Sequence, residues 1–198
     1  MGLLGDADAA AELGAIVLSG GSAVRFQGAD KASIEVGGAT LLEHALAALV
    51  EVPEVVVVGG EVPTLRPVTF LREDPPGGGP AAGVLAGLSG FPRTPRQIVV
   101  LAVDMPLVTT ATVSRLLLST AADGALLVDE SGRRQYLCAA YRTAALLAAA
   151  PPVEQRHGLP MRTLVGALRL AEVPAVGWES RDVDTWSDLT EVRERLDG

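Results

Sequence analysis

The sequence predicts a single α/β domain built on a mostly parallel, doubly wound sheet with helices on both faces. Apolar runs alternate along the chain with helical patterns, as expected when each strand is followed by a crossover helix. Several of these runs are continuously apolar and β-branched, which is typical of strands buried on both faces. The 198 residues are enough for one domain with a substantial core.

The first half of the chain is expected to form a βαβ unit and a third strand. Residues 15–18 are a short apolar run that ends near two glycines. Thr40 precedes a helical pattern over residues 41–51, and Glu43 stands at the spacing of a capping box. Four valines follow a glutamate in the strand predicted at 54–58. Residues 68–72 form the third strand, ahead of an acidic pair and a Pro/Gly loop.

The second half continues the alternation. Small residues over 80–88 predict a helix that packs closely on the sheet, and residues 97–103 have the strongest strand pattern. Further strands are predicted at 125–129 and 135–141, with helices at 112–119 and 143–149. Thr185 and Asp188 have capping-box spacing, so a last helix is expected to begin there.

Composition excludes several functional classes. The net charge is −8 and the sequence pI is about 4.8, so a basic surface for nucleic acid is not expected. Arg25 and Lys31 form a local cationic pair in this acidic chain, which fits a small phosphorylated ligand better. Cys138 is the only cysteine, which excludes an intramolecular disulfide and a Cys-based metal cluster. Its apolar surroundings predict a buried, inert thiol.

The chain carries no signal for a membrane or for secretion. Residues 1–14 are small and acidic, and we expect them to be a flexible leader ahead of the domain at 15–198. No uncharged apolar run approaches the ~18 residues that a membrane span requires. The sequence therefore predicts a soluble, cytoplasmic protein.

The stretch from Ser19 to Lys31 is the strongest candidate for a ligand-binding loop. Gly20 and Gly21 follow a predicted strand closely, and adjacent glycines allow a sharp turn and a close approach of N–H groups to a ligand. With Arg25 and Lys31 close behind, the pattern favours a polyanion. It matches neither the P-loop nor the dinucleotide-binding glycine pattern. On spacing alone, an ordinary strand-to-turn junction with two solvated cations remains an alternative.

Candidate ligand-binding residues follow three of the predicted strands. Gly20, Asp74 and Asp104 are expected at one edge of the sheet, where open α/β sheets bind ligands. Desolvating a carboxylate such as Asp104 costs free energy unless it is paired or binds a metal. Such a site suits Mg²⁺, because this metal takes one or two protein carboxylates together with phosphates and water. The alternatives are that Asp104 caps the next helix and that Asp74 only forms a turn.

The loop resembles the signature of the molybdenum cofactor guanylyltransferases, a branch of the sugar-nucleotide-type nucleotidyltransferases. The pattern L-S-G-G-x-x-x-R-F-x-G-x-D-K runs from Leu18 to Lys31, where the family has L-A-G-G-x-x-x-R-M-G-x-D-K. Ser19 replaces the usual Ala, Phe26 replaces Met, and Gln27 lengthens the interval to the next glycine. None of these departures removes a glycine or a cation.

Three further segments are similar to this family. A-V-D-M-P, around Asp104, resembles the C-D-x-P element, and residues 73–88, with Asp74, look like the D-x(n)-G-P-L-A-G segment. D-V-D-T-W-S-D-L, over 182–189, resembles N-[VI]-[ND]-T-P-E-D-L, with Trp186 for Pro. Gly59 and Gly60 stand where the family often has an Asn, which leaves base selectivity open.

The resemblance implies a Rossmann-like nucleotidyltransferase that moves GMP from GTP to the phosphate of molybdopterin, with Mg²⁺, and releases pyrophosphate. Its catalytic residues would be Arg25, Lys31 and Asp104. Asp104 and Asp184 would hold the metal, with Asp182 as a weaker candidate. Gln135 and Tyr136 lie where relatives carry a residue facing the acceptor, although strand surface is an equally good interpretation. The implied nucleotide-binding residues are Leu18, Ser19, Gly20, Gly21, Lys31, Asp74 and Asp104.

The implied partners are GTP and molybdopterin, with transient contact to molybdenum-cofactor biosynthesis or acceptor proteins. CTP as donor would make the protein a molybdopterin cytidylyltransferase, and other acceptors would be methylerythritol phosphate or phospholactate. A non-catalytic nucleotide-binding protein is disfavoured because Lys31, Asp104 and Asp184 are all present. A dinucleotide oxidoreductase is disfavoured because the loop lacks G-x-G-x-x-G.

Overall fold

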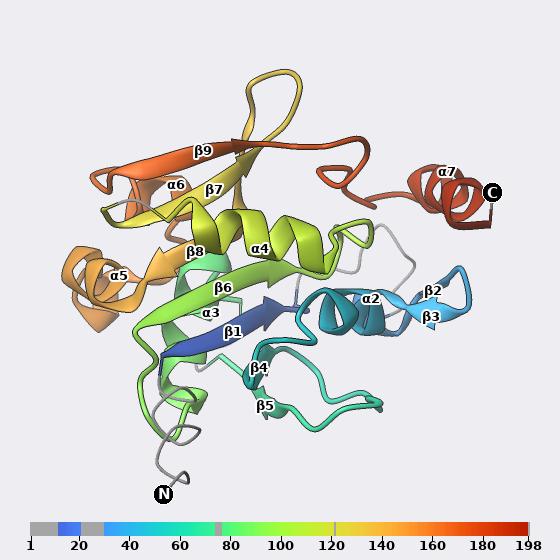
Figure 1. The fold of residues 1–198 in the computed structure, drawn as a ribbon. Helices are drawn as coiled ribbons and strands as arrows, with labels where there is room; N and C mark the ends of the chain where they lie inside the picture. Colours follow the sequence, from blue (N-terminus) through green and yellow to red (C-terminus); the bar gives the residue numbers. More distant parts are fainter. Residues whose placement is uncertain (1–11, 21–29, 74–76, 121, 198) are drawn as a thin grey trace, which may run out of the picture.

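The computed structural model describes residues 12–20, 30–73, 77–120 and 122–197 (Figure 1). Five strands form the central sheet in the order β5-β4-β1-β6-β8. Neighbouring strands run parallel except β8, which is antiparallel to β6. The mostly parallel sheet is therefore confirmed. Its strands are β1 (Leu13–Leu18), β4 (Glu54–Val58), β5 (Thr69–Leu71), β6 (Gln97–Ala102) and β8 (Arg134–Arg142).

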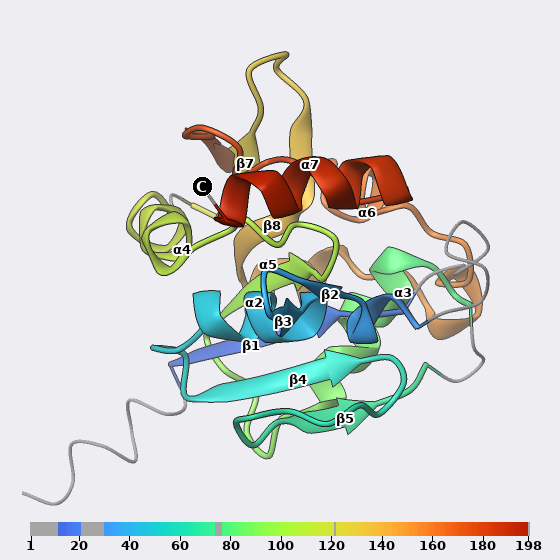
Figure 2. The ribbon, with the colours of Figure 1, turned by 90° about the vertical axis from the view of Figure 1, so that its right-hand side faces the viewer.

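Two further strands extend the sheet beyond β8. β7 (Gly124–Val128) and β9 (Leu170–Pro174) pair in parallel, and β7 lies beside β8. The backbones of β7 and β8 approach closely at Gly124, where a Cβ atom would collide with the backbone of Ala140 and Tyr141. The turn between β7 and β8 projects from the body of the fold, as Figure 2 shows.

Helices cover both faces of the sheet, as predicted. α2 (Leu41–Ala48), α4 (Thr110–Leu118) and α7 (Trp186–Asp197) pack into one core cluster together with Ala15 and Val17 of β1. α3 (Pro80–Gly87), α5 (Thr143–Ala149) and α6 (Met161–Leu164) pack into the other cluster, with Ile16 and Leu18. The alternation along β1 follows from the two-residue period of a strand. In Figure 1, α4 crosses in front of the sheet and α3 lies behind it.

The remaining elements are short. β2 (Glu35–Val36) and β3 (Ala39–Thr40) form a small hairpin, and three 3₁₀ turns are η2 (Lys31–Ser33), η3 (Leu88–Gly90) and η4 (Val153–Gln155). The hairpin turns at Gly37 and Gly38, whose φ angles of 55° and 81° favour glycine.

The strand predicted at 54–58 and the helix predicted at 143–149 have the predicted bounds. The helix predicted over 41–51 ends instead at Ala48. The carbonyl groups of Leu49 and Val52 accept hydrogen bonds from the Arg66 guanidinium, at 2.8 Å each. These carbonyl groups therefore have hydrogen-bond partners without a further turn of helix. β1 begins at Leu13, two residues before the predicted start, and β9 and α6 were not predicted.

Two of the predicted helix starts are confirmed, with one difference. Thr40 Oγ1 accepts the N–H of Glu43 at 3.1 Å, but the Glu43 carboxylate accepts the N–H of Leu65 rather than closing the capping box. At α7, Thr185 and Asp188 do form the reciprocal pair. Thr185 N–H donates to Asp188 Oδ2 at 2.8 Å, and Asp188 N–H donates to Thr185 Oγ1 at 3.2 Å.

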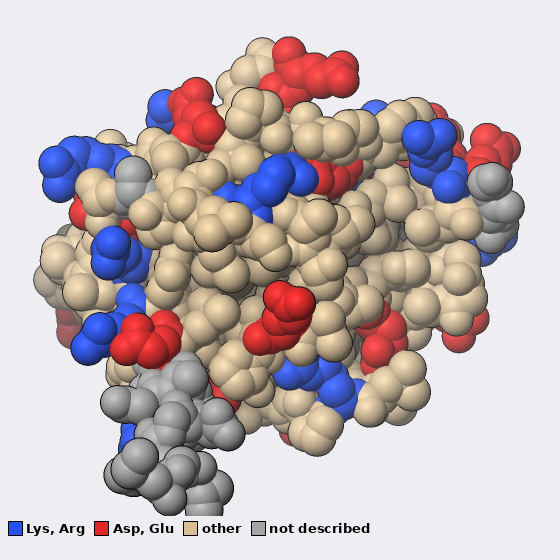
Figure 3. Space-filling model, in the orientation of Figure 1, with Lys and Arg blue, Asp and Glu red and all other residues tan. Residues whose placement is uncertain are grey.

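On the face shown in Figure 3, positive and negative side chains are scattered without a continuous basic stripe. Within the described ranges, no helix has the length and apolar character needed to cross a bilayer. Residues 1–11, most of the predicted leader, lie outside the described residues.

Candidate active site

The carboxyl ends of three neighbouring strands meet at one edge of the sheet. Leu18, the last residue of β1, is in register with Val58 at the end of β4 and with Ala102 at the end of β6. Residues that follow these strands therefore come together. Ser19 and Gly20 continue from β1, and Asp104 follows β6 after one further strand-like bond, from Val103 N–H to Leu18 O at 3.1 Å.

Ser19 and Gly20 are tied to the end of β4. The N–H groups of Ser19 and Gly20 both donate to the carbonyl of Val58, at 3.0 and 3.3 Å, and the Ser19 hydroxyl donates to the same oxygen. A Cβ atom at position 59 would collide with that hydroxyl. Position 59 therefore leaves no room for a side chain beside Ser19 and Gly20 as they are placed.

Lys31 reaches two carboxylates that come from distant parts of the chain. Its Nζ lies 3.2 Å from Asp104 Oδ2 and 3.1 Å from Asp184 Oδ1. The backbone of Lys31 is held at the start of η2, where Asp30 accepts the N–H of Ala32 at 3.0 Å. The Lys31 side chain is 19% exposed, compared with 30% for Asp104 and 46% for Asp184. The Lys31 side chain as a whole is thus less exposed than that of either aspartate.

The pKa of Asp104 is perturbed by its surroundings. Burial raises the pKa of Asp104 above its ordinary value, although the neighbouring Lys31 ammonium lowers it. Asp184 and Asp182 add smaller contributions that raise the same pKa. The backbone of Asp104 is also engaged, because its carbonyl accepts the N–H of Val183 at 2.7 Å. This bond holds the segment that carries Asp182 and Asp184 against the end of β6.

The start of α7 fixes Asp184. Its N–H donates to Asp188 Oδ2 at 3.1 Å, the same oxygen that Thr185 uses. The hydrogen bond from the Thr185 hydroxyl lowers the pKa of Asp188 below its ordinary value, so the cap stays ionised. Arg181 in turn pairs with Asp188 at 3.1 Å and with Glu191 at 2.7 Å. The helix-capping interpretation of this motif is confirmed, and it leaves the carboxylate of Asp184 directed to Lys31.

A buried glutamate anchors the other end of this segment. The side chain of Glu179 is 6% exposed and accepts from the Thr112 hydroxyl, the Arg115 guanidinium and the N–H of Val176. Thr112 and Arg115 belong to α4, so the loop before α7 is fastened to that helix. The sequence did not single out Glu179, since one charge in a polar loop has no pattern of its own.

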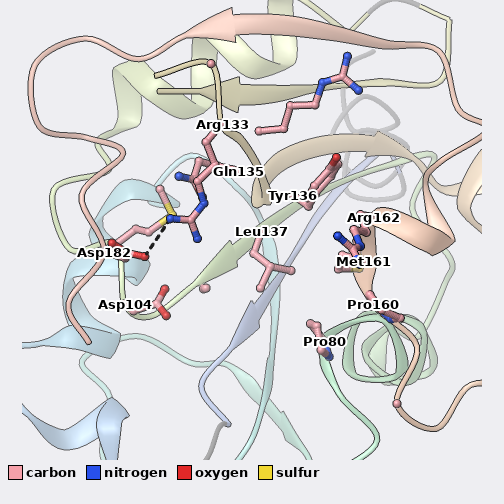
Figure 4. Close-up of a pocket in the computed structure, with 15 residues that line it drawn as sticks. Pro80, Asp104, Arg133, Gln135, Tyr136, Leu137, Pro160, Met161, Arg162 and Asp182 are labelled. Atoms are coloured by element: carbon pink, nitrogen blue, oxygen red, sulfur yellow. Dashed lines mark ion pairs between the residues drawn. The ribbon is translucent and has the colours of Figure 1, made fainter. Parts of the chain in front are cut away.

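A pocket of about 830 Å³ opens beside Asp104 (Figure 4). In Figure 4, Asp104 and Asp182 lie on one side and Arg162, Met161 and Pro160 on the other. Arg133 Nη1 lies 4.0 Å from Asp182 Oδ2 at the rim. The pocket is lined by Pro80, Ala102, Asp104, Met105, Gly132, Arg133, Arg134, Gln135, Tyr136, Leu137, Gly158, Pro160, Met161, Arg162 and Asp182.

Gln135 and Tyr136 line this pocket, so they are not merely strand surface. Arg133, Leu137 and Met161 line it as well and were not singled out from the sequence. Their approach depends on the packing of β8 against α6, which no local pattern reveals. Gly21, Arg25 and Asp74 lie outside the described residues, so their predicted roles stay predictions.

The donor set at this edge fits a hard divalent cation. Among the residues that the structure describes, no three His, Cys, Asp or Glu side chains form a metal cluster. However, Asp104 and Asp184 already share one cation, the Lys31 ammonium. Mg²⁺ commonly takes one or two protein carboxylates and completes its shell with substrate phosphates and water. Two converging carboxylates therefore suit a metal that arrives with a nucleotide.

The chain is similar to known nucleotidyltransferases. Residues 15–172 match the family model described as the MobA-like NTP transferase domain. No curated protein sequence matches the chain.

Several solved structures share the fold. Molybdopterin-guanine dinucleotide biosynthesis protein A from Archaeoglobus fulgidus has 22% identity and a TM-score of 0.70, over 93% of this chain and 98% of that one. The 2-C-methyl-D-erythritol 4-phosphate cytidylyltransferase of Thermus thermophilus has 25% identity and a TM-score of 0.68, over 94% and 100%. Rv0371c from Mycobacterium tuberculosis has 19% identity and a TM-score of 0.72, over 93% and 99%.

Proposed function

This chain belongs to the MobA-like NTP transferase family and is a nucleotidyltransferase, and on that premise we propose that it transfers GMP from GTP to the phosphate of molybdopterin. The observation that carries the proposal is the convergence of Lys31, Asp104 and Asp184 beside an open pocket. Such a site holds phosphates and a metal next to room for a second substrate.

The nucleotide lies against the loop after β1. Its base faces the backbone of Leu18 to Gly20, and its phosphates reach Lys31. Gly21, Arg25 and Asp74 complete the proposed nucleotide site, with Arg25 on the leaving pyrophosphate. Lys31 supports this assignment because its ammonium lies at the edge where α/β sheets bind ligands.

Asp104 and Asp184 are the proposed ligands of Mg²⁺. When bound, the metal would neutralise charge on the reacting phosphates. Asp104 is half-buried at the end of β6, and the hydrogen bond of the Asp184 N–H to Asp188 fixes the backbone at Asp184, so both carboxylates are held at this edge. A further observation in favour is that these carboxylates already accommodate a cation, in the form of Lys31.

The pocket beside Asp104 is the proposed acceptor site. Its apolar lining includes Tyr136, Leu137 and Met161, which suits a planar heterocycle such as the pterin ring. Arg133 and Arg162 add cationic groups at the opposite rims for an anionic acceptor. At about 830 Å³, the pocket has room for more than a small three-carbon acid.

The transfer itself needs little covalent help from the protein. An oxygen of the acceptor phosphate forms a bond to the α-phosphorus of GTP, and the bond from that phosphorus to the bridging oxygen of pyrophosphate breaks. No general base is required, because the attacking phosphate is already ionised. The protein contributes by placing the two phosphates in line and by neutralising their charge, which is what Lys31 and the two aspartates are positioned to do.

A cytidylyltransferase is the second candidate, because the Thermus thermophilus cytidylyltransferase shares 25% identity over 94% of this chain. The two are separated by measuring pyrophosphate release from each of the four nucleoside triphosphates, with Mg²⁺, in the presence and absence of molybdopterin. Our proposal predicts release from GTP only when molybdopterin is added. Preference for CTP would support the second candidate. Release only with methylerythritol phosphate or phospholactate would overturn the acceptor.

Absence of release with every combination would argue for a non-catalytic nucleotide-binding protein. Calorimetric titration with GTP and Mg²⁺ would then test whether nucleotide binds at all. Transient contact with molybdenum-cofactor biosynthesis or acceptor proteins is a further part of the proposal, since such a product is handed to another protein. A cytoplasmic location is proposed on the same ground.

A further inference from the structure

Lys31 is the only lysine among the sixteen Lys and Arg residues of the chain. Its ammonium lies within 3.2 Å of carboxylate oxygens from two segments that are far apart in sequence. A lysine whose sole task is to bind phosphate would not need to sit between two acids. The ammonium therefore lies where the two carboxylates would share a divalent cation.

Two arginines near this site have other carboxylate partners. Arg133 lies 4.0 Å from Asp182, and Arg181 pairs with Asp188 and Glu191. Within residues 12–20, 30–73, 77–120 and 122–197, Lys31 is a cation that contacts both Asp104 and Asp184 directly. An ammonium and a metal ion cannot both occupy the space between two carboxylates, because their like charges repel strongly at such short distances.

We infer that Lys31 is an internal counter-cation that holds the place of the metal until a nucleotide arrives. This inference rests on the proposed function, in which the nucleotide phosphates bind Lys31 and the two aspartates bind Mg²⁺. The phosphates give the ammonium a new partner and draw it from the carboxylates. Asp104 and Asp184 would then be available to hold a metal supplied with the nucleotide, and the protein without nucleotide should bind the metal poorly.

The arrangement has a second consequence for the carboxylates themselves. Without a cation between them, Asp104 and Asp184 would repel each other, and this repulsion would act on the loop before α7, which carries Asp184. Lys31 keeps both in the positions that the metal requires. The site is therefore preorganised for a cation while it excludes the free metal ion.

The test is a calorimetric titration with Mn²⁺ alone, without nucleotide or acceptor. The variant Lys31→Met removes the ammonium and keeps a similar side-chain length, and Lys31→Arg is the matched control that keeps the charge. We expect Lys31→Met to bind Mn²⁺ at least roughly tenfold more tightly than the wild type, the scale of one lost neighbouring charge that is partly shielded. Lys31→Arg should bind as weakly as the wild type. Adding Asp104→Asn to Lys31→Met should abolish the gain.

Equal Mn²⁺ affinities for the wild type and Lys31→Met would overturn the inference. Unfolding in urea establishes whether Lys31→Met is folded. A second measurement uses the wild type alone, because its single lysine can be reductively methylated with a carbon-labelled reagent and observed by NMR. The lysine signal should shift on addition of GTP with Mg²⁺ and stay unchanged with Mg²⁺ alone. A shift with Mg²⁺ alone would contradict the inference.

The two levels of the argument fail differently. If the proposed function is wrong, no product forms with GTP and molybdopterin, whatever the metal titrations show. If only the present inference is wrong, product forms normally and the Mn²⁺ titrations of the wild type and Lys31→Met coincide.

Discussion

Replacing Glu179 with alanine should destabilise the protein strongly, because this carboxylate anchors the loop before α7. Glu179 is 6% exposed, and its removal leaves the Arg115 guanidinium and the fully buried Thr112 hydroxyl without their partner. Breaking a buried pair by removing one partner typically costs about 3 to 5 kcal/mol. Arg115 remains 33% exposed and can be solvated, so we expect the lower end, about 3 kcal/mol.

The assay is urea unfolding of the wild type and Glu179→Ala. In thermal unfolding, the same loss of about 3 kcal/mol corresponds to a decrease in Tm of roughly 6 to 12 °C for a chain of this size. The matched control is Glu172→Ala, which breaks an ion pair with Arg134 of the same chemistry but about half exposed on each side. That variant should lose less than about 1 kcal/mol. Similar losses in the two variants would refute the assignment of Glu179 as a buried anchor.

Three further predictions test other parts of the structure. Cys138 is fully buried and burial raises the pKa of its thiol, so a thiol reagent should label no cysteine in the native protein and one after denaturation. Gly59→Ala should destabilise the protein by more than about 1 kcal/mol in urea unfolding, and adding Ser19→Ala should recover part of the loss because the colliding hydroxyl is gone. The pKa of Asp188 is lowered in the folded state from its ordinary value of 3.8. Its carboxylate therefore contributes stability that is present above pH 3.8 and is lost as the pH falls through the folded-state pKa. Asp188→Asn should therefore lose less stability than the wild type between about pH 4 and about pH 2.

The elements that the sequence predicted best are those with unambiguous boundaries. Residues 54–58 are bounded by Pro53 and Gly59, and their valines are buried on both faces, so the run could only be a central strand. β9 was not predicted because Val173 is its one buried residue and the strand lies at the outer end of the sheet. Its partner β7 is distant in sequence, and the pairing is decided by tertiary packing rather than local pattern.

The acidic edge of the candidate site could be predicted for a similar reason. Asp104 lies two residues after the end of an apolar strand, and parallel strands place their carboxyl ends together. The resemblance to a known family placed both Lys31 and Asp184 in the site, but their contact, which spans 153 positions, was not predicted, because no spacing in the sequence relates two such distant residues. Gln135 and Tyr136 were candidates for the acceptor side and do line the pocket, whereas the wall opposite Asp104 was not predicted as part of a pocket, because Met161 and Arg162 are brought to β8 by a four-residue helix without a sequence signature.

The most direct test of the central claim follows the label from GTP labelled at the α-phosphate into a molybdopterin dinucleotide. The wild-type protein with Mg²⁺ should form the labelled product. Asp104→Asn should form less than about a hundredth of it while unfolding at a similar urea concentration, because a positioned charge in such a site is typically worth a factor of 10² or more. Equal label transfer by Asp104→Asn, or none by the wild type with either GTP or CTP, would contradict nucleotidyl transfer at this site.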